Sequence, residues 1–334
     1  MRHTLALTVG LLCAGLAAPA WGQTPTLTVY TYSSFTAEWG PGPAIEKAFE
    51  AECDCQLDYV SLEDGVTLLS RLQLEGVNTK ADVVLGLDMN LMAEATATDL
   101  FAPHEAGLSH LTLPVEWTDD LFIPFDYGYF AFVYDKTRLA EPPESLDELV
   151  NGDAEEKILI QDPRTSTPGL GLLLWMKKVY GDEADAAWRK LQPRILTVSK
   201  GWSESYGLFM EGEAPMVLSY TTSPAYHQIA EEDDRFAAAS FTEGHYLQIE
   251  VAGRVATSDN AELAQKFLDF VVSPGFQSTI PTGNWMYPVI ALEDGLPPAF
   301  DTLVKPEEAL LFTPEEVAAN RKRWIDEWLA AMSQ

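Results

Sequence analysis

The chain has 334 residues, and its 51 acidic residues outnumber its 21 basic residues, so the formal net charge at pH 7 is −30. Such a surface repels nucleic acids and anionic lipids and attracts cations, so we expect no nucleic-acid partner. Hydrophobic residues make up 47% of the chain, which is enough for large buried cores, and the length suits two domains.

The first 22 residues are typical of a secretory signal peptide. Arg2 provides a short positive region, residues 5–18 are almost wholly apolar, and Ala20 and Gly22 offer small side chains at the two positions that a signal peptidase needs. The apolar stretch is too short to span a membrane. A leucine stands directly before Cys13, where a lipoprotein signal needs a small residue, so we expect a soluble exported product that begins near residue 23.

After this segment the chain alternates between short apolar runs, typical of buried strands, and amphipathic stretches, typical of helices. The predicted strands are 26–32, 55–62, 81–88, 120–136, 157–161, 195–199, 216–220 and 245–257. The predicted helices are 40–52, 65–76, 143–151, the segment opened by Pro168, 202–212, 260–273 and 313–333. This order predicts an α/β fold with a mixed, mostly parallel sheet and helices on both of its faces.

Two predicted strands, 120–136 and 245–257, are longer than one sheet needs. We interpret them as crossings between two α/β lobes. On this interpretation the N-terminal lobe comprises residues 23–122 and 249–288, and the C-terminal lobe comprises residues 123–248 and 289–334.

Two stretches place hydroxyl residues between an apolar strand and a helix that opens with proline. They are Thr165-Ser166-Thr167 before Pro168, and Tyr220-Thr221-Thr222-Ser223 before Pro224. Serine often caps a helix and proline fits its first turn, so Ser223 is expected to be a cap. The free N–H groups of a helix start also favour an anion, so a ligand site is the alternative to two ordinary capped helices.

Asp64 lies between a predicted strand and helix, and the glycine after it, Gly65, would let the backbone approach a ligand. The alternative role for Asp64 is a helix N-cap. Aromatic residues gather at the same strand ends, and flat rings beside a carboxylate suit a flat organic cation. These rings are Tyr32, Trp39, Trp202, Tyr220, Tyr226, Trp285 and Tyr287.

Sequence motifs for catalysis are absent. The chain has no phosphate-binding loop, no nucleophile elbow and no zinc-binding helix, and its histidines lack metal-ligand spacing. Cys53 and Cys55 are expected to form a structural disulfide after export, with a reactive thiol as the alternative. We therefore expect no catalytic residue, no metal and no cofactor.

Several long runs of the chain resemble the thiamine-binding family of bacterial periplasmic receptors. Among them are SLEDGVTLLSRL, QDPRTSTPGLGLLLWMKKVYGD, KGWSESYGLF, LSYTTSPAYH and IPTGNWMYPV, and the resemblance covers nearly the whole chain after the signal segment. It implies a two-lobed type II periplasmic-binding-protein fold whose interlobe cleft closes on thiamine, thiamine monophosphate or thiamine diphosphate. It also implies a monomeric periplasmic receptor, not an enzyme, which serves an inner-membrane ABC permease with a cytoplasmic ATPase.

Carried over by position, the resemblance assigns ligand contacts to a set of residues at the predicted strand ends. They are Asp64, Gly65, Ser166, Thr167, Trp202, Tyr220, Thr221, Thr222 and Ser223, together with the aromatic positions Tyr32, Trp39, Tyr226 and Trp285. Relatives that bind ferric ion use two adjacent tyrosines, whereas here Thr221 follows Tyr220. Two alternatives stay open: a thiamine-degrading transferase with a cysteine nucleophile, and a receptor for another small cation such as a polyamine.

Overall fold

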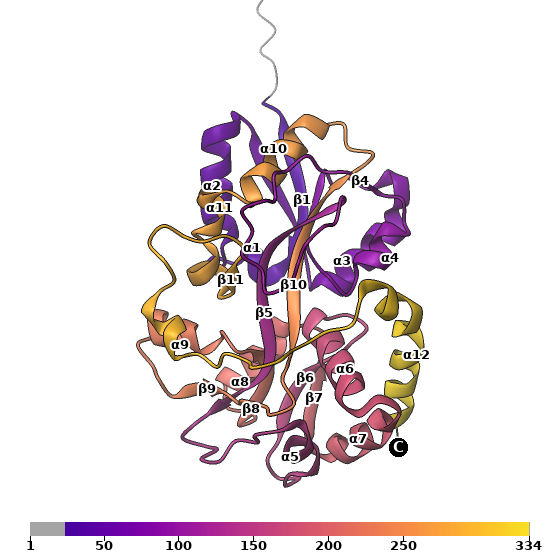
Figure 1. Ribbon diagram of the computed structural model, residues 1–334, viewed down its shortest axis with the longest axis vertical. Helices are drawn as coiled ribbons and strands as arrows, with labels where there is room; N and C mark the ends of the chain where they lie inside the picture. Colours follow the sequence, from indigo (N-terminus) through magenta and orange to yellow (C-terminus); the bar gives the residue numbers. More distant parts are fainter. Residues whose placement is uncertain (1–23, 334) are drawn as a thin grey trace, which may run out of the picture.

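The computed structural model describes residues 24–333, and its two lobes are stacked along the longest axis of the molecule (Figure 1). The expected signal peptide at residues 1–22 lies outside the described residues. Helices flank a mixed sheet in both lobes, which confirms the predicted fold class.

The N-terminal lobe holds parallel strands with helices on both sides (Figure 1). Its elements are β1 (Thr26–Tyr32), α1 (Ser33–Thr36), α2 (Gly42–Cys53), β2 (Gln56–Leu62), α3 (Gly65–Glu75), β3 (Val83–Asp88), α4 (Met92–Thr96), β4 (Phe101–Ala102), α10 (Ala261–Val271), α11 (Pro274–Gln277) and β11 (Tyr287–Pro288). All six residues of β3 are buried, as expected for a continuous apolar strand with both faces covered.

The C-terminal lobe repeats this arrangement around a second group of strands, in which β6 pairs in parallel with two neighbours. Its elements are α5 (Leu146–Asn151), β6 (Ile158–Gln161), α6 (Thr167–Tyr180), α7 (Ala184–Leu191), β7 (Ile195–Ser199), α8 (Trp202–Met210), β8 (Met216–Tyr220), α9 (Pro224–Ala230), β9 (Phe236–Ala238), β12 (Ala309–Leu310) and α12 (Pro314–Met332).

Two long strands, β5 (Phe122–Asp135) and β10 (His245–Val255), run between the lobes (Figure 1). The strand order is β2-β1-β3-β10-β5-β8-β6-β7. Residues 122–129 of β5 pair with β10, and residues 130–134 pair with β8 in the other lobe. The residue limits assigned to the lobes stay a prediction, because both strands pass from one lobe to the other without a break.

The C-terminal helix α12 begins with the capping box that its sequence indicates. Thr313 Oγ1 accepts the backbone N–H of Glu316 at 3.2 Å, and Glu316 Oε2 accepts that of Thr313 at 2.8 Å. The helix packs on α7 and on α4. Its side chains form ion pairs with both lobes, Arg321 with Glu94 of α4 and Glu327 with Lys177 of α6.

Several elements of the structure are absent from the sequence prediction. Helix α7 is one of them, although its buried residues Ala184, Ala187, Trp188 and Leu191 recur at helical spacing. The strands β4, β9, β11 and β12 have two or three residues each, which is too short for an alternating pattern. They form because β5 and β10 offer edges for pairing.

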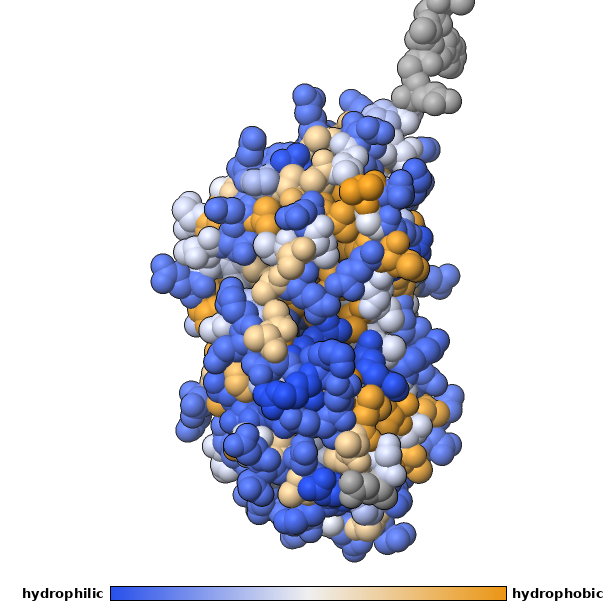
Figure 2. All heavy atoms as spheres, turned by 90° about the vertical axis from the view of Figure 1, so that its right-hand side faces the viewer, coloured by the Kyte–Doolittle hydropathy of each residue, from blue (hydrophilic) through white to orange (hydrophobic). Residues whose placement is uncertain are grey.

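One face of the molecule is largely hydrophilic. On the face that carries α3, α4 and α12, hydrophilic residues surround smaller groups of apolar ones (Figure 2). Within residues 24–333, no helix has the length and apolar character needed to cross a membrane.

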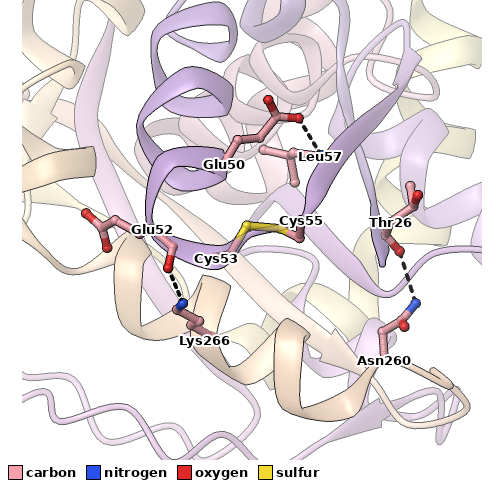
Figure 3. Close-up of a disulfide and its surroundings, with 8 residues drawn as sticks. All are labelled: Thr26, Glu50, Glu52, Cys53, Cys55, Leu57, Asn260 and Lys266. Carbon is pink, nitrogen blue, oxygen red and sulfur yellow. Dashed lines mark hydrogen bonds between the residues drawn. A yellow bond between two sulfur atoms is a disulfide. The ribbon is translucent and has the colours of Figure 1, made fainter. Parts of the chain in front are cut away.

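Cys53 and Cys55 form a disulfide between the end of α2 and the start of β2, which confirms the predicted pairing (Figure 3). Asp54 between them adopts the left-handed conformation, with φ of 52°. Nearby, Lys266 of α10 donates a hydrogen bond to the carbonyl of Glu52 at 2.5 Å. The disulfide therefore closes a tight turn at a helix–strand junction that α10 also holds.

Protein purified from the periplasm should contain no free thiol, because Cys53 and Cys55 are paired. Unfolded in guanidinium without reductant, it should not react with a thiol-specific chromogenic reagent, and after reduction it should react at two sites. Cys53→Ser should expose one thiol without reduction. Two reactive thiols in the unreduced wild-type protein would contradict the pairing.

Candidate functional site

A cavity of about 460 Å³ lies between the two lobes, a volume that suits a small organic molecule. Part of the residue set expected from the sequence lines it: Tyr32, Trp39, Asp64, Trp202, Tyr220, Ser223, Tyr226 and Trp285. The rest of the set does not line it and is buried in the protein: Gly65, Ser166, Thr167, Thr221 and Thr222.

Aromatic rings from opposite lobes meet in pairs at the cavity wall. Trp39, in the loop after α1, faces Trp202 at the start of α8, with ring centroids 6.2 Å apart. Trp285 of the N-terminal lobe meets Tyr226 of α9 edge to face, at 5.2 Å. Each pair takes one ring from each lobe, so a movement of the lobes would open both pairs.

Trp202 is held in place by its neighbours. Its indole N–H donates to Ser219 Oγ at 2.8 Å, and its ring stacks on Tyr206 at 4.7 Å. The Ser219 hydroxyl also lies 2.7 Å from Ser223 Oγ. The orientation of the Trp202 ring is therefore set before any ligand enters.

Asp64 caps a helix and also lines the cavity. As the N-cap of α3 it accepts the N–H of Gly65 on Oδ1 at 2.8 Å, and it lies in the cavity wall. Its Oδ2 accepts the hydroxyl of Ser166 at 2.8 Å. Burial raises the pKa of Asp64, and the hydrogen bonds from Ser166 and Gly65 act in the opposite direction.

The contact between Asp64 and Ser166 joins the start of α3 in one lobe to the start of α6 in the other. Gly65 permits this approach, because a Cβ there would lie 2.5 Å from the carbonyl oxygen of Gly86 and 2.6 Å from Thr167 Oγ1. In the structure this glycine serves close packing between the lobes, whereas the sequence suggested access for a ligand.

The segment 220–223 differs from its expected conformation at one residue. Ser223 does not cap α9 with its side chain, because its backbone is already helical, with φ of −54° and ψ of −34°, whereas a capping serine is extended. Its hydroxyl accepts the N–H of Tyr220 instead, at 3.2 Å. Thr221 and Thr222 are fully buried, and the hydroxyl of Thr222 contacts the sulfur of Met286 at 3.8 Å.

Carboxyl groups from three neighbouring strands lie beneath the cavity. Glu250 of β10 stands opposite Asp88 of β3 and Asp126 of β5 in the sheet register, and Glu250 lines the cavity. Burial raises the pKa of Asp88 to about 7 and that of Asp126 to about 7. Burial and then the charge of Asp126 raise the pKa of Glu250 well above its ordinary value.

This row of acids has no basic partner in the described part of the chain. None of the ion pairs within residues 24–333 involves Asp88, Asp126 or Glu250. The lining of the cavity contains no lysine, arginine or histidine. Over the same residues, no cluster of His, Cys, Asp or Glu is arranged to hold a metal ion. The site is therefore suited to an organic cation.

Sequence analysis missed several residues of the lining, among them Glu63, Ser203, Tyr206, Glu250, Asn284 and Met286. For Glu250 and Asp126 a usable signal exists, because each is an acid in the interior of a long strand and has mostly apolar neighbours. A buried acid without a partner is costly and often marks a functional site. Asn284 and Met286 come from irregular loops, where position in the chain does not predict which way a side chain faces.

Comparisons with known proteins identify the relatives of this chain. Residues 78–320 match the model of the bacterial extracellular solute-binding protein family. The chain is 61% identical over 324 residues to a thiamine-binding periplasmic protein of Salmonella typhimurium, with 97% of each chain covered. It is 56% identical over 334 residues to one of Brucella suis, with 100% of each covered. The solved structure of a periplasmic thiamin binding protein matches with a TM-score of 0.92 at 60% identity, covering 96% of this chain and 100% of that chain.

The buried acid Asp88 should make stability depend on pH. Its folded pKa of about 7 lies above the unfolded value, so its contribution to stability is fully present below the unfolded pKa and is lost as the pH rises from there through 7. Asp88→Asn carries no charge at any pH. The free energy of unfolding of the variant, relative to that of the wild type, should therefore be about 1–3 kcal/mol higher at pH 8 than at pH 5.

The measurement is the free energy of unfolding in urea for both proteins at the two pH values. The exposed Asp58→Asn serves as the control, and its difference from the wild type should be the same at both. Equal effects of Asp88→Asn at pH 5 and pH 8 would show that Asp88 is ionised in the folded protein throughout.

Proposed function

The chain belongs to the bacterial extracellular solute-binding protein family, and from this premise we propose that it is a periplasmic receptor that captures thiamine between its lobes and delivers it to an ABC importer. The observation that carries the proposal is the cavity itself, which combines aromatic walls, a carboxyl floor and a lining without basic residues. Thiamine is a flat organic cation, with a positively charged thiazolium ring and a neutral aminopyrimidine ring. Its charge and its rings match the floor and the walls.

The paired rings provide places for the two heterocycles. Trp39 and Trp202 form one interlobe pair, and Tyr226 and Trp285 form the other. A cation on a good aromatic face gains about 0.5–2 kcal/mol, and stacked rings gain about 0.5–1.5 kcal/mol beyond their buried area. Asp64 supplies a charged acceptor in the same cavity. Together these contacts favour a heteroaromatic cation over a flexible aliphatic one.

The proposal extends to thiamine monophosphate and thiamine diphosphate. The first turns of α6 and α8 reach the cavity through Pro168, Trp202 and Ser203. Free N–H groups at such helix starts favour phosphate oxygens without a buried lysine. At the rim Lys200 pairs with Glu63 at 2.9 Å and is 65% exposed. Unphosphorylated thiamine would leave no buried cation of the protein unpaired, so all three forms are accepted.

In this proposal the protein acts as a monomer. Loaded and closed, it docks on an inner-membrane permease that a cytoplasmic ATPase drives. The interlobe contacts at the cavity are polar or aromatic, and several are partly exposed, so individually they are weak. Weak contacts of this kind allow the lobes to open again when the receptor meets its permease.

The structure speaks against the enzyme alternative. Cys53 and Cys55 are joined in a disulfide and neither lines the cavity. They precede β2, whereas Asp64 follows it, and seven residues of strand separate the two ends by about 20 Å. Within residues 24–333 no thiol is therefore placed to attack a ligand. A polyamine receptor is the second alternative, and competition between thiamine and spermidine separates it from a thiamine receptor.

Trp202→Ala should raise the dissociation constants of thiamine, its monophosphate and its diphosphate by similar factors, because all three share the rings. The expected increase is about 5–100-fold, from the lost stacking and cation–π contact. Intrinsic fluorescence titration measures the three affinities. Leu74→Ala, at a residue that is 89% exposed, is the control and should leave all three dissociation constants unchanged. If the variant lost affinity only for the phosphorylated forms, the proposed contact between Trp202 and the rings of thiamine would be contradicted.

Asp64→Asn should weaken the binding of thiamine by about 1.5–3 kcal/mol, because a charge-assisted contact becomes neutral inside a closed cavity. The variant keeps an acceptor for the N–H of Gly65, so its fold should be retained. Isothermal titration calorimetry measures the affinity, and thermal unfolding checks the fold. Asp58→Asn, on the exposed side of β2, controls for the change in net charge. An affinity for thiamine that is unchanged within twofold would show that Asp64 only caps α3 and does not contribute to binding.

A further inference from the structure

Glu250 and Asp126 form a close pair of buried acids in the floor of the cavity. They are directly opposite each other on the antiparallel strands β10 and β5, and they are 7% and 0% exposed. The amide of Asn284 donates to Asp126 Oδ2 at 2.5 Å and lies 3.4 Å from Glu250 Oε2. The hydroxyl of Tyr32 donates to Glu250 Oε2 at 2.8 Å. The other oxygen of Asp126, Oδ1, is buried and has no partner within the described residues.

The groups that face this pair from the surrounding elements are acids or phenols. They are Tyr32 from β1, Asp64 from the start of α3, Asp88 from β3 and Tyr220 from β8. None of them can supply a positive charge. Two carboxylates at adjacent buried positions cannot both ionise at low cost without a cation, so the pair keeps a proton. The pKa shifts of both groups have the direction that a retained proton requires. The pKa of Asp126 is raised to about 7, and that of Glu250 is raised well above its ordinary value.

We propose that the Glu250–Asp126 pair exchanges its proton for the bound cation, so that ligand binding releases a proton to solvent and affinity rises with pH. This inference rests on the proposed function, since it needs a ligand with a permanent positive charge. A cation in the cavity offsets the repulsion between the two carboxylates and stabilises their ionised form. The proton then leaves the carboxyl group for the buffer.

The pH dependence follows from linkage. Below about pH 7 the free protein carries the proton and must release it, so binding is weakened in proportion to proton concentration. At a pH high enough for the free pair to lose the proton by itself, the affinity reaches a plateau. Over the pH range in which the free pair is protonated, release of one proton makes binding about tenfold tighter for each unit of pH.

The first measurement needs no ligand. Infrared spectroscopy of the free wild-type protein in deuterated buffer at neutral pH should show the carbonyl stretch of a protonated carboxyl group, and Glu250→Gln should lose or shift that band. A free protein without such a band overturns the inference, whether or not thiamine binds. Failure of thiamine to bind while the band is present would instead count against the proposed function.

The second measurement is calorimetry with thiamine near pH 7 in buffers of different ionisation enthalpy. The wild type should release between half and one proton on binding, whereas Glu250→Gln and Asp126→Asn should release almost none and bind with little dependence on pH. Asp126→Asn serves as the second variant in case the first fails to fold. Asp58→Asn removes an exposed carboxylate outside the cavity and should keep the release of the wild type. Zero release by the wild type, or equal release by wild type and Glu250→Gln, would overturn the proposal.

Discussion

Burial of acidic groups without a basic partner is the constraint on which this site depends. Asp88, Glu250 and Asp126 stand on neighbouring strands, so the sheet register brings them together beneath the cavity. In a medium of low polarity a carboxylate without a counter-charge is costly, and no ion pair of the described residues relieves it. A cation that enters from solvent supplies what the protein lacks. On the proposed function, the same groups give the cavity its preference for positive charge.

Closure of the lobes gives the cavity its shape through contacts between residues that are distant in sequence. Ser166 at the start of α6 donates to Asp64 at the start of α3, and the rings of Trp39 and Trp202 approach from opposite sides. On the outside, α12 adds an ion pair to each lobe. Lys177 is buried in its pair, whereas both partners of the Arg321–Glu94 pair are partly exposed. Such a closure is specific in geometry and still reversible, as a receptor that must release its ligand requires.

Local chemistry explains which helix starts were predicted correctly. Thr313 and Glu316 form their capping box because both partners lie within the same turn, so nothing distant is needed. Ser223 carries the same kind of signal, yet its hydroxyl turns toward Ser219 and the N–H of Tyr220. Ser219 also accepts a hydrogen bond from the indole N–H of Trp202, which lies in another segment of the chain. A residue type that favours a helix cap therefore predicts the cap only where no tertiary hydrogen bond competes for its side chain.

The sequence by itself determined the class of fold, the strand and helix order, the long strands β5 and β10, the disulfide and the aromatic character of the site, because these follow from periodicity, composition and short-range chemistry. It also placed Asp64 and Trp202 at strand ends, which meet at one edge of an α/β sheet. Only the tertiary structure decided which side chains face the cavity. Thr221 and Thr222 lie behind its wall, while Glu250 and Asn284 enter it. The physical reason is that strand register and lobe closure join residues more than a hundred positions apart, and no local pattern encodes that geometry.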